Sequence, residues 1–328
     1  MGKRKERMES VKIGFIGCGG IAAVHRDRLV RRNDIELVGC CDILPEQAES
    51  FAARWRIPIF KDAVSLYDNA RPHAVYISVP PFAHGALETE AAARGIHLFV
   101  EMPVALDLQT ARAISAAIRK AKVLAMVGYC YRYCDLTQQA HRLLAGEVIS
   151  LATGRFHCGM PEADWWRRRE QSGGQIVEQT THVIDLLLHL CGPVSEVHAM
   201  GAHGCMSKIK NFDVDESSVI NLRLKTGAVA SISSTCILNH PGSMSLEIAT
   251  PRLCLALTNE TLRVREDHKI VEYLNHTDMY EKESELFIHA VQQGKRGGIR
   301  STYADAIKTL RVTLAANESI QTGLPVVL

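Results

Sequence analysis

Glycines between positions 17 and 20 could bring bare backbone against a phosphate group. Gly17, Gly19 and Gly20, followed by Ile21 and Ala22, fit the pattern G-x-G-x-x-G/A directly after an apolar run. Glycine suits a sharp turn and a close approach to a diphosphate, and the last small residue lets the next helix lie close to the strand. The free N–H groups that begin this helix would face the phosphates. A glycine-rich turn without a ligand is the alternative.

A carboxylate about 20 residues further along could bind a ribose. Asp42 ends a second apolar run, where an acidic residue would accept hydrogen bonds from an adenosine ribose. Its charge would repel a 2′-phosphate, which favours NAD(H) over NADP(H). Asp42 could instead cap the following helix, which has Pro45 in its first turn. The two features together predict a dinucleotide-binding site.

A carboxylate one helical turn before an imidazole could act as an acid–base pair. Glu178, His182 and Asp185 lie at i, i+4 and i+7, so they share one face of a helix expected over Gln175 to Leu190. Glu178 would fix the tautomer of His182 and raise its basicity, and the free ring nitrogen could take a proton from a substrate hydroxyl. A buried polar cluster between helix and sheet is the alternative. A metal site is a third, although we expect no metal.

An aromatic and basic loop precedes this helix. Trp165 and Trp166 stand next to Arg167. Sugar rings stack on tryptophan, and the arginine fork binds carboxylate or phosphate. The tryptophans could instead fill a groove between domains while the arginine stays solvated.

Strand and helix patterns alternate from Val11 to Val127, and the strands are continuously apolar. This is typical of a parallel sheet covered on both faces. Ligands of such sheets bind beyond the carboxyl ends of the strands. Gly17, Asp42, Val79–Pro80 and Glu101–Met102 all follow predicted strands, so one crevice could collect them.

The pattern changes after residue 129. From residue 149 onward, alternating segments separated by turns predict a large open sheet that is mainly antiparallel, followed by helices over 278–294 and 302–318. We therefore expect an α/β protein in which a doubly wound Rossmann sheet precedes an α/β domain with that open sheet. The expected division is a flexible basic tail (1–10), a dinucleotide-binding domain (11–129) and a substrate-binding and oligomerisation domain (130–328), with the last helix packed back on the first domain.

Composition excludes several other classes of protein. The chain has 328 residues and a formal net charge of only +2, which is not typical of nucleic-acid or membrane-surface proteins. No apolar run approaches the roughly 18 residues of a membrane span. The ten cysteines are scattered and form no C-x-x-C pair, which indicates buried free thiols in a reducing cytoplasm.

The order and spacing of these motifs resemble the Gfo/Idh/MocA family of NAD(P)-dependent oxidoreductases. The matching stretches are GFIGCGGIA (14–22), Asp42, VPPFAH (79–84), VEMPVAL (100–106), VGYCYRY (127–133), GGQIVEQTTHVIDLL (173–187) and ADAIKTLRVTLAANESIQTG (304–323). The resemblance implies bound NAD, a sugar, inositol or related polyol as substrate, and a homodimer or homotetramer formed through the free face of the sheet.

The resemblance also implies roles for single residues. Glu101 would lie near the nicotinamide ribose, with Val79, Pro80, His84 and Met102 beside the cofactor. His182 would be the catalytic histidine, and Glu178 stands where the family has an aspartate. Arg132 matches an arginine that contacts substrate in some members, and we expect Trp165, Trp166, Arg167 and Asp185 on the substrate side with it.

One departure from the family concerns the lysine of its E-K-P motif, which is Met102 in this chain. Methionine can neither donate a hydrogen bond nor carry charge. If the lysine does general acid–base work, its loss lowers the rate by about 10²–10⁴. Three functions stay open: a dehydrogenase that relies on His182, a non-catalytic or regulatory NAD-binding protein, and an NAD-assisted lyase or glycosidase.

Overall fold

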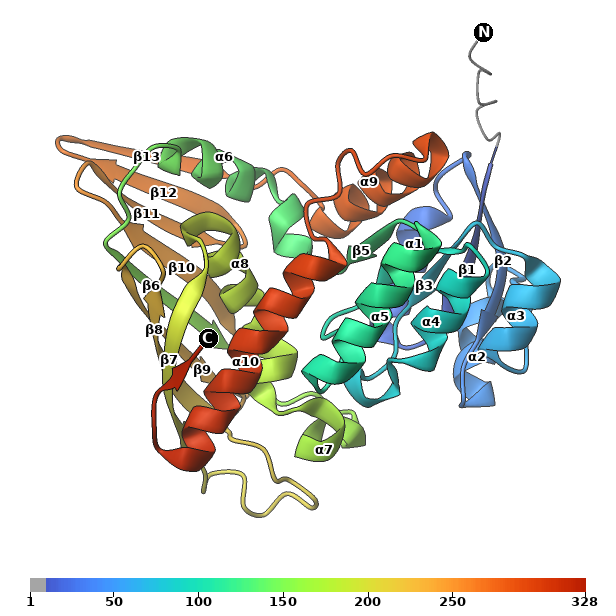
Figure 1. Cartoon of the computed structure of the whole chain (residues 1–328), viewed down its shortest axis with the longest axis horizontal. Helices are drawn as coiled ribbons and strands as arrows, with labels where there is room; N and C mark the ends of the chain where they lie inside the picture. The colour runs from blue at the N-terminus through green and yellow to red at the C-terminus, as the bar shows by residue number, and fades with distance from the viewer. Residues whose placement is uncertain (1–9) are drawn as a thin grey trace, which may run out of the picture.

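A five-stranded parallel sheet forms the first half of the chain, in the order β2-β1-β3-β4-β5 (Figure 1). The computed structural model describes residues 10–328. The strands are β1 (Val11–Ile16), β2 (Ile35–Cys41), β3 (Ala74–Ile77), β4 (His97–Val100) and β5 (Ala125–Val127). Every residue of β3 is buried, because helices cover both faces of the sheet, and this explains the continuous apolar strands.

Helices connect these strands in the manner of a Rossmann domain. They are α1 (Gly20–Leu29), α2 (Pro45–Ala53), α3 (Ala63–Ala70), the 3₁₀ helix η1 (Pro81–Ala83), α4 (Ala86–Ala93) and α5 (Leu108–Ala121). Asp107 caps α5 by accepting a hydrogen bond from the Thr110 N–H. The buried residues Ala111, Ile114 and Ile118 of α5 lie at i, i+3 and i+7 and face the sheet.

The second sheet has nine strands in the order β13-β12-β11-β10-β6-β9-β8-β7-β14. Only β6 and β9 pair in parallel, so the predicted fold class is confirmed. The strands are β6 (Leu151–His157), β7 (Val194–Ala202), β8 (Ser217–Leu224), β9 (Val229–Thr235), β10 (Ser243–Ala249), β11 (Leu253–Thr258), β12 (Thr261–Glu266), β13 (Lys269–Leu274) and β14 (Val326–Val327). Buried and exposed residues alternate along β8, because one face of this sheet packs on helices and the other does not.

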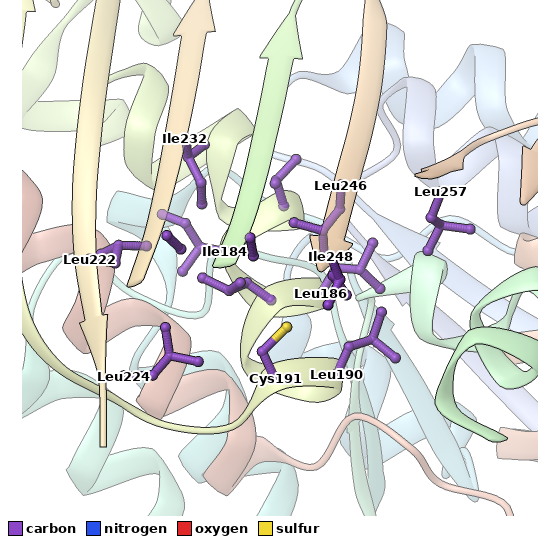
Figure 2. Close-up of a cluster of buried hydrophobic side chains, with 14 of the residues drawn as sticks. Ile184, Leu186, Leu190, Cys191, Leu222, Leu224, Ile232, Leu246, Ile248 and Leu257 are labelled. Atoms are coloured by element: carbon purple, nitrogen blue, oxygen red, sulfur yellow. The ribbon is translucent and has the colours of Figure 1, made fainter. Parts of the chain in front are cut away.

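Helix α8 fills the covered face of the second sheet. Figure 2 shows Ile184, Leu186 and Leu190 of this helix among sheet side chains such as Leu222 and Leu246. The helical segments of this part are η2 (Cys130–Tyr133), α6 (Asp135–Leu144), η3 (Asp164–Arg167), α7 (Arg169–Ser172), the π-helix η4 (Ile176–Thr180) and α8 (Thr181–Cys191).

Two long helices tie the halves together. Helix α9 (Met279–Gln293) packs on α1 and η2, and α10 (Tyr303–Thr322) crosses the middle of the molecule against α5, α8 and β7 (Figure 1). None of the helices within residues 10–328 is both long and apolar enough to span a membrane. Of the predicted basic tail, residues 1–9 lie outside the described part of the chain.

Candidate active site

The glycine turn after β1 leaves room above its backbone. Gly17 has a φ of +83°, and a Cβ at this position would collide with the carbonyl of Ser78, so only glycine fits. A Cβ on Gly19 or Gly20 would instead meet no atom within 4 Å. Helix α1 begins with Gly20 and Ile21, and no side chain caps its N-terminus. Its first N–H groups are therefore available to a diphosphate.

The Asp42 carboxylate joins this turn to the end of β2. Its Oδ2 accepts a hydrogen bond from the Cys18 N–H (2.7 Å) and its Oδ1 accepts one from the Leu44 N–H (2.9 Å). Leu44, not Asp42, is the N-cap of α2, so the simple capping alternative does not describe this side chain. Each carboxylate oxygen can accept more than one hydrogen bond, which leaves capacity for ribose hydroxyls.

The ends of the parallel strands meet along one edge, as the sequence predicted. Backbone hydrogen bonds continue beyond the last residues of the strands. The N–H groups of Ser78, Glu101 and Gly128 donate to the carbonyls of Ile16, Ile77 and Val100, respectively, at 2.8–2.9 Å. Val79 and Pro80 follow Ser78 and are half-buried at this edge. These bonds hold the four strand ends in a fixed arrangement.

The imidazole of His84 is bound on one side by a buried carboxylate. Its side chain is fully buried, and its Nδ1 lies 2.5 Å from Oε1 of Glu88, which is also buried. Glu88 additionally accepts the N–H of Gly85 and so caps α4. Glu88 thus fixes the Nδ1 side of the ring, whereas Nε2 is buried and has no hydrogen-bond partner among residues 10–328, so a contact between His84 and the cofactor stays a prediction.

Glu101 lies over the end of β5 and is held by protein groups on both oxygens. Oε1 is 2.6 Å from Nε2 of His25, and Oε2 accepts a hydrogen bond from the Met102 N–H (3.3 Å). A Cβ on Gly128 would lie 2.5 Å from Oε2 of Glu101, so glycine is needed beneath the carboxylate. Met102 is half-buried and packs with the Rossmann core.

A π-helix separates Glu178 from His182. The i, i+4 spacing of these residues assumes α-helical geometry, in which one turn takes about 3.6 residues. Glu178 lies in the π-helix η4, whose turns are wider, and His182 lies in α8. Oε2 of Glu178 accepts a hydrogen bond from the Trp166 Nε1–H (2.5 Å), so the expected contact between Glu178 and His182 stays a prediction.

His182 sits among aromatic rings with a free nitrogen. The ring of Phe156 is stacked on it at a centroid distance of 6.0 Å, and the rings of Tyr129 and Tyr131 present their edges at 6.2 and 5.3 Å. Within residues 10–328, no group bonds its buried Nδ1. Burial lowers the pKa of His182 to about 4, and the nearby Glu101 charge opposes this shift. The imidazole is therefore neutral at neutral pH.

The pKa of Glu178 shifts in the opposite direction from that of His182. Burial raises the pKa of Glu178 to about 7, and the hydrogen bond from Trp166 partly opposes the shift. The carboxyl group therefore exchanges a proton near neutral pH. Its pKa matches general acid–base work better than that of His182.

Arg132 and Asp185 form a buried ion pair. The guanidinium donates from Nε to Oδ2 (2.6 Å) and from Nη2 to Oδ1 (2.7 Å) of Asp185, and Nη1 donates to the carbonyl of Arg300 (2.8 Å). Thr309 also donates to Asp185 Oδ1. Because η2, α8 and α10 meet at this pair, it holds the three helical elements together, and the substrate contacts of Arg132 and Asp185 stay a prediction.

The Trp165–Arg167 loop is only in part available to a substrate. Trp166 is fully buried, Trp165 is half-buried beside it, and Arg167 donates to Asp164 Oδ1 and to the carbonyl of Glu162. Arg167 is thus bound within its own loop. The buried indole of Trp166 reaches the site through Glu178 and not by stacking on a sugar.

Sequence reasoning missed His25 and Glu283. His25 contacts Glu101 at 2.6 Å, and Oε1 of Glu283 lies 3.9 Å from the same nitrogen. A signal was present, because His25 lies between Ala22 and Leu29 on the buried face of α1, and Glu283 lies one turn before the buried Phe287. Polar residues on an apolar helix face are expected to meet a partner.

Comparison with known proteins identifies the family. Residues 11–129 match the family described as "Oxidoreductase family, NAD-binding Rossmann fold" (GFO_IDH_MocA), and residues 138–252 match the GFO/IDH/MocA C-terminal domain. The chain is 24% identical to the uncharacterized oxidoreductase YrbE of Bacillus subtilis over 332 residues, covering 97% of this chain and 96% of that protein. It is 26% identical to inositol 2-dehydrogenase of Rhizobium meliloti over 331 residues, covering 95% and 97%.

Solved structures share the whole fold. The structure of GenD2 from gentamicin A biosynthesis, in complex with NAD, superposes with a TM-score of 0.85 at 17% identity and covers 100% of this chain and 99% of its own. The WlbA dehydrogenase of Bordetella pertussis, in complex with NADH and UDP-GlcNAcA, superposes with a TM-score of 0.83 at 21% identity, covering 97% and 99%. The chain belongs to the Gfo/Idh/MocA family of oxidoreductases.

Proposed function

We propose that this protein is an NAD-dependent oxidoreductase that transfers hydride between a sugar, an inositol or a related polyol and the nicotinamide. The observation that carries the proposal is the free, neutral imidazole of His182. This ring lies beside the ring of Tyr129, and Tyr129 follows the end of β5 by two residues. Relatives named as inositol and glucoside dehydrogenases support the substrate class.

The described residues fit a dinucleotide. The bare turn at Gly17 and the uncapped start of α1 would hold the diphosphate, and Asp42 would bind the adenosine ribose beyond β2. Because β3 and β4 lie on the other side of β1 from β2, the nicotinamide half would lie toward Val79, Pro80 and Glu101. The negative charge of Asp42 favours NAD over NADP.

The chain's own residues would handle the proton of the reaction. NAD⁺, when bound, supplies the hydride acceptor. As the carbinol C–H bond gives up its electron pair with the hydrogen, the hydroxyl loses a proton and a carbonyl forms. The neutral imidazole of His182 can accept that proton, and Glu178, with a pKa of about 7, is a second acid–base group of the proposed site. The aromatic rings around His182 would cover the apolar faces of a sugar ring.

The alternative function is non-catalytic NAD binding, and Met102 favours it. Its thioether packs with the Rossmann core and places no cation next to Glu101. Such a protein would bind cofactor tightly but would not turn over. An NAD-assisted lyase or glycosidase would form product without net NADH.

The test is a panel of polyols and sugars, with NADH absorbance and product both measured. We expect NADH formation, a loss of about 10²–10⁴-fold in kcat for His182→Asn, and no change for His198→Asn, since His198 is exposed on β7. Product without NADH would support the lyase reading. Tight NAD binding without turnover in the wild type and in Met102→Lys would support the non-catalytic reading.

We further propose a homodimer or homotetramer that works in the cytoplasm on a small molecule and without nucleic acid or membrane partners. The uncovered face of the nine-stranded sheet supports association. All ten cysteines are free thiols, which fits a reducing compartment.

A further inference from the structure

Three ionisable side chains meet in a closed space beside the strand-end edge. The Nε2 atom of His25 lies 2.6 Å from Oε1 of Glu101 and 3.9 Å from Oε1 of Glu283. One ligand-type atom from each residue falls within 4.8 Å of the other two. His25 and Glu283 have no exposed surface, and Glu101 is 5% exposed. Helices α1 and α9 and the residue that follows β4 are thus joined by titratable groups.

The three side chains of this cluster differ in how many hydrogen bonds they make. Glu101 is bonded on both oxygens, and Nδ1 of His25 contacts the Ser284 hydroxyl at 3.3 Å. The carboxyl of Glu283, by contrast, is buried and has no hydrogen-bond partner on either oxygen among residues 10–328. Burying an ionised carboxylate without hydrogen bonds costs free energy, so such a group keeps its proton unless a positive charge comes close.

Besides the cluster itself, two charged side chains and four neutral ones face Glu283. Arg28 is the positive one, and Asp278 is negative but bonded to Arg28. Around the cluster are the neutral groups Tyr76, Cys130, Tyr133 and Tyr280. Burial, followed by the Glu101 charge, raises the pKa of Glu283 well above its usual range. The absence of an ammonium at position 102 leaves Glu101 as the charged end of the cluster toward the cofactor.

We propose that His25, Glu101 and Glu283 form a buried proton store whose occupancy follows the charge of the nicotinamide. This inference rests on the proposed function, which places the nicotinamide next to Glu101. The oxidised ring is a cation and the reduced ring is neutral. A unit charge about 10 Å away, at an effective dielectric constant of about 20, changes proton affinity on the order of tenfold. The affinity of the store for its proton therefore falls when NAD⁺ binds and rises again when the ring is reduced.

The proton balance of the reaction is unchanged over a full cycle. Oxidation of a carbinol by NAD⁺ yields a carbonyl, NADH and one proton. Because the occupancy of the store is lower in the NAD⁺ complex, reduction of the ring lets Glu283 take up protons in the same step that frees the hydroxyl proton. Exchange of NADH for NAD⁺ then releases that proton to solvent. The protonation of the cluster thus changes with the charge of the cofactor, although the chain has no lysine at position 102.

The test counts protons on cofactor binding by titration calorimetry of the full chain. NAD⁺ and NADH are each titrated between pH 6 and 9 in phosphate and in Tris, whose ionisation enthalpies differ. We expect the NAD⁺ enthalpy of the wild type to depend on the buffer, showing proton release, and the NADH enthalpy to depend on it much less. Glu283→Gln should lose this difference. Glu285→Gln is the matched control, because Glu285 is half-buried on the same helix and accepts a hydrogen bond from Lys282 outside the cluster.

A second readout does not depend on the heat of binding. The infrared difference spectrum between the NAD⁺ and NADH complexes should contain the carbonyl stretch of one protonated carboxyl group, and Glu283→Gln should remove that band. An unchanged buffer dependence in Glu283→Gln, an equal proton count for NADH, or one equivalent of a divalent metal retained at the cluster would overturn the proton store. Absence of binding by either nucleotide would instead overturn the proposed function itself.

Discussion

Glu178 illustrates how a single hydrogen bond sets the chemistry of a residue. Its carboxylate accepts a hydrogen bond from the indole N–H of Trp166, the largest fully buried side chain of the described residues. A hydrogen bond to the charged form of an acid lowers its pKa, whereas burial raises it. The balance here leaves the pKa of Glu178 at about 7. Trp166 is therefore a residue that positions and tunes Glu178.

Replacing Trp166 with phenylalanine should move the titration of Glu178 to higher pH. The folded-state pKa of Glu178 is raised from 4.5 to about 7, so its contribution to stability is full below pH 4.5 and is lost as the pH rises through 7. The urea midpoint of wild type relative to Glu178→Gln, measured from pH 4 to 9, should show this decline. In the Trp166→Phe background the decline should shift upward. Trp165→Phe is the control, and an equal shift there would contradict the assignment.

At the scale of elements, the sequence predicted most strands and helices but not the local geometry that decides the site. Periodicity located the helix that carries His182, yet nothing in IVEQT distinguishes a π-helix from an α-helix, because the difference is one hydrogen-bond register. β13 is mostly exposed or half-buried and lies at the edge of the sheet, so burial imposes little pattern on it. The Arg132–Asp185 pair joins residues 53 apart, a contact that no local spacing indicates.

This ion pair should contribute strongly to stability, because its members are 6% and 2% exposed. Asp185→Asn leaves the Arg132 charge buried without a counter-ion, and we expect it to lower the free energy of unfolding by about 3–5 kcal/mol. The matched control is Glu147→Gln, which breaks the pair with Arg252, whose side chain is 52% exposed. That change should remove about 1 kcal/mol or less. Chemical denaturation followed by circular dichroism measures both, and equal losses would contradict the structural role of Asp185.

At the scale of the molecule, the two halves meet through the last two helices and not through a linker. Helix α9 brings Glu283 to the Rossmann half, and α10 places Thr309 on Asp185 while it packs on α5. The carboxyl edge of the parallel sheet and the helix that carries His182 are therefore held in a fixed relation. Residues more than 250 positions apart, such as His25 and Ser284, contact each other as a result. The order of motifs along the chain predicted the two halves, whereas these long-range contacts depend on packing.

The uncovered face of the nine-stranded sheet gives the last prediction. Neighbouring strands place exposed apolar residues side by side on it, Met200 next to Val219 and Leu151 next to Val229. We expect these pairs to be covered by a second copy of the chain, because apolar cross-strand pairs on a wide open face favour a symmetric contact. Light scattering after size exclusion should therefore give the mass of a dimer or tetramer for the wild type. Val219→Lys should shift the mass toward the monomer, since a buried lysine without a partner opposes association. Val64→Lys, which adds the same charge at an exposed valine of α3, should not. A monomeric wild type, or equal masses for all three proteins, would rule out this face as the interface.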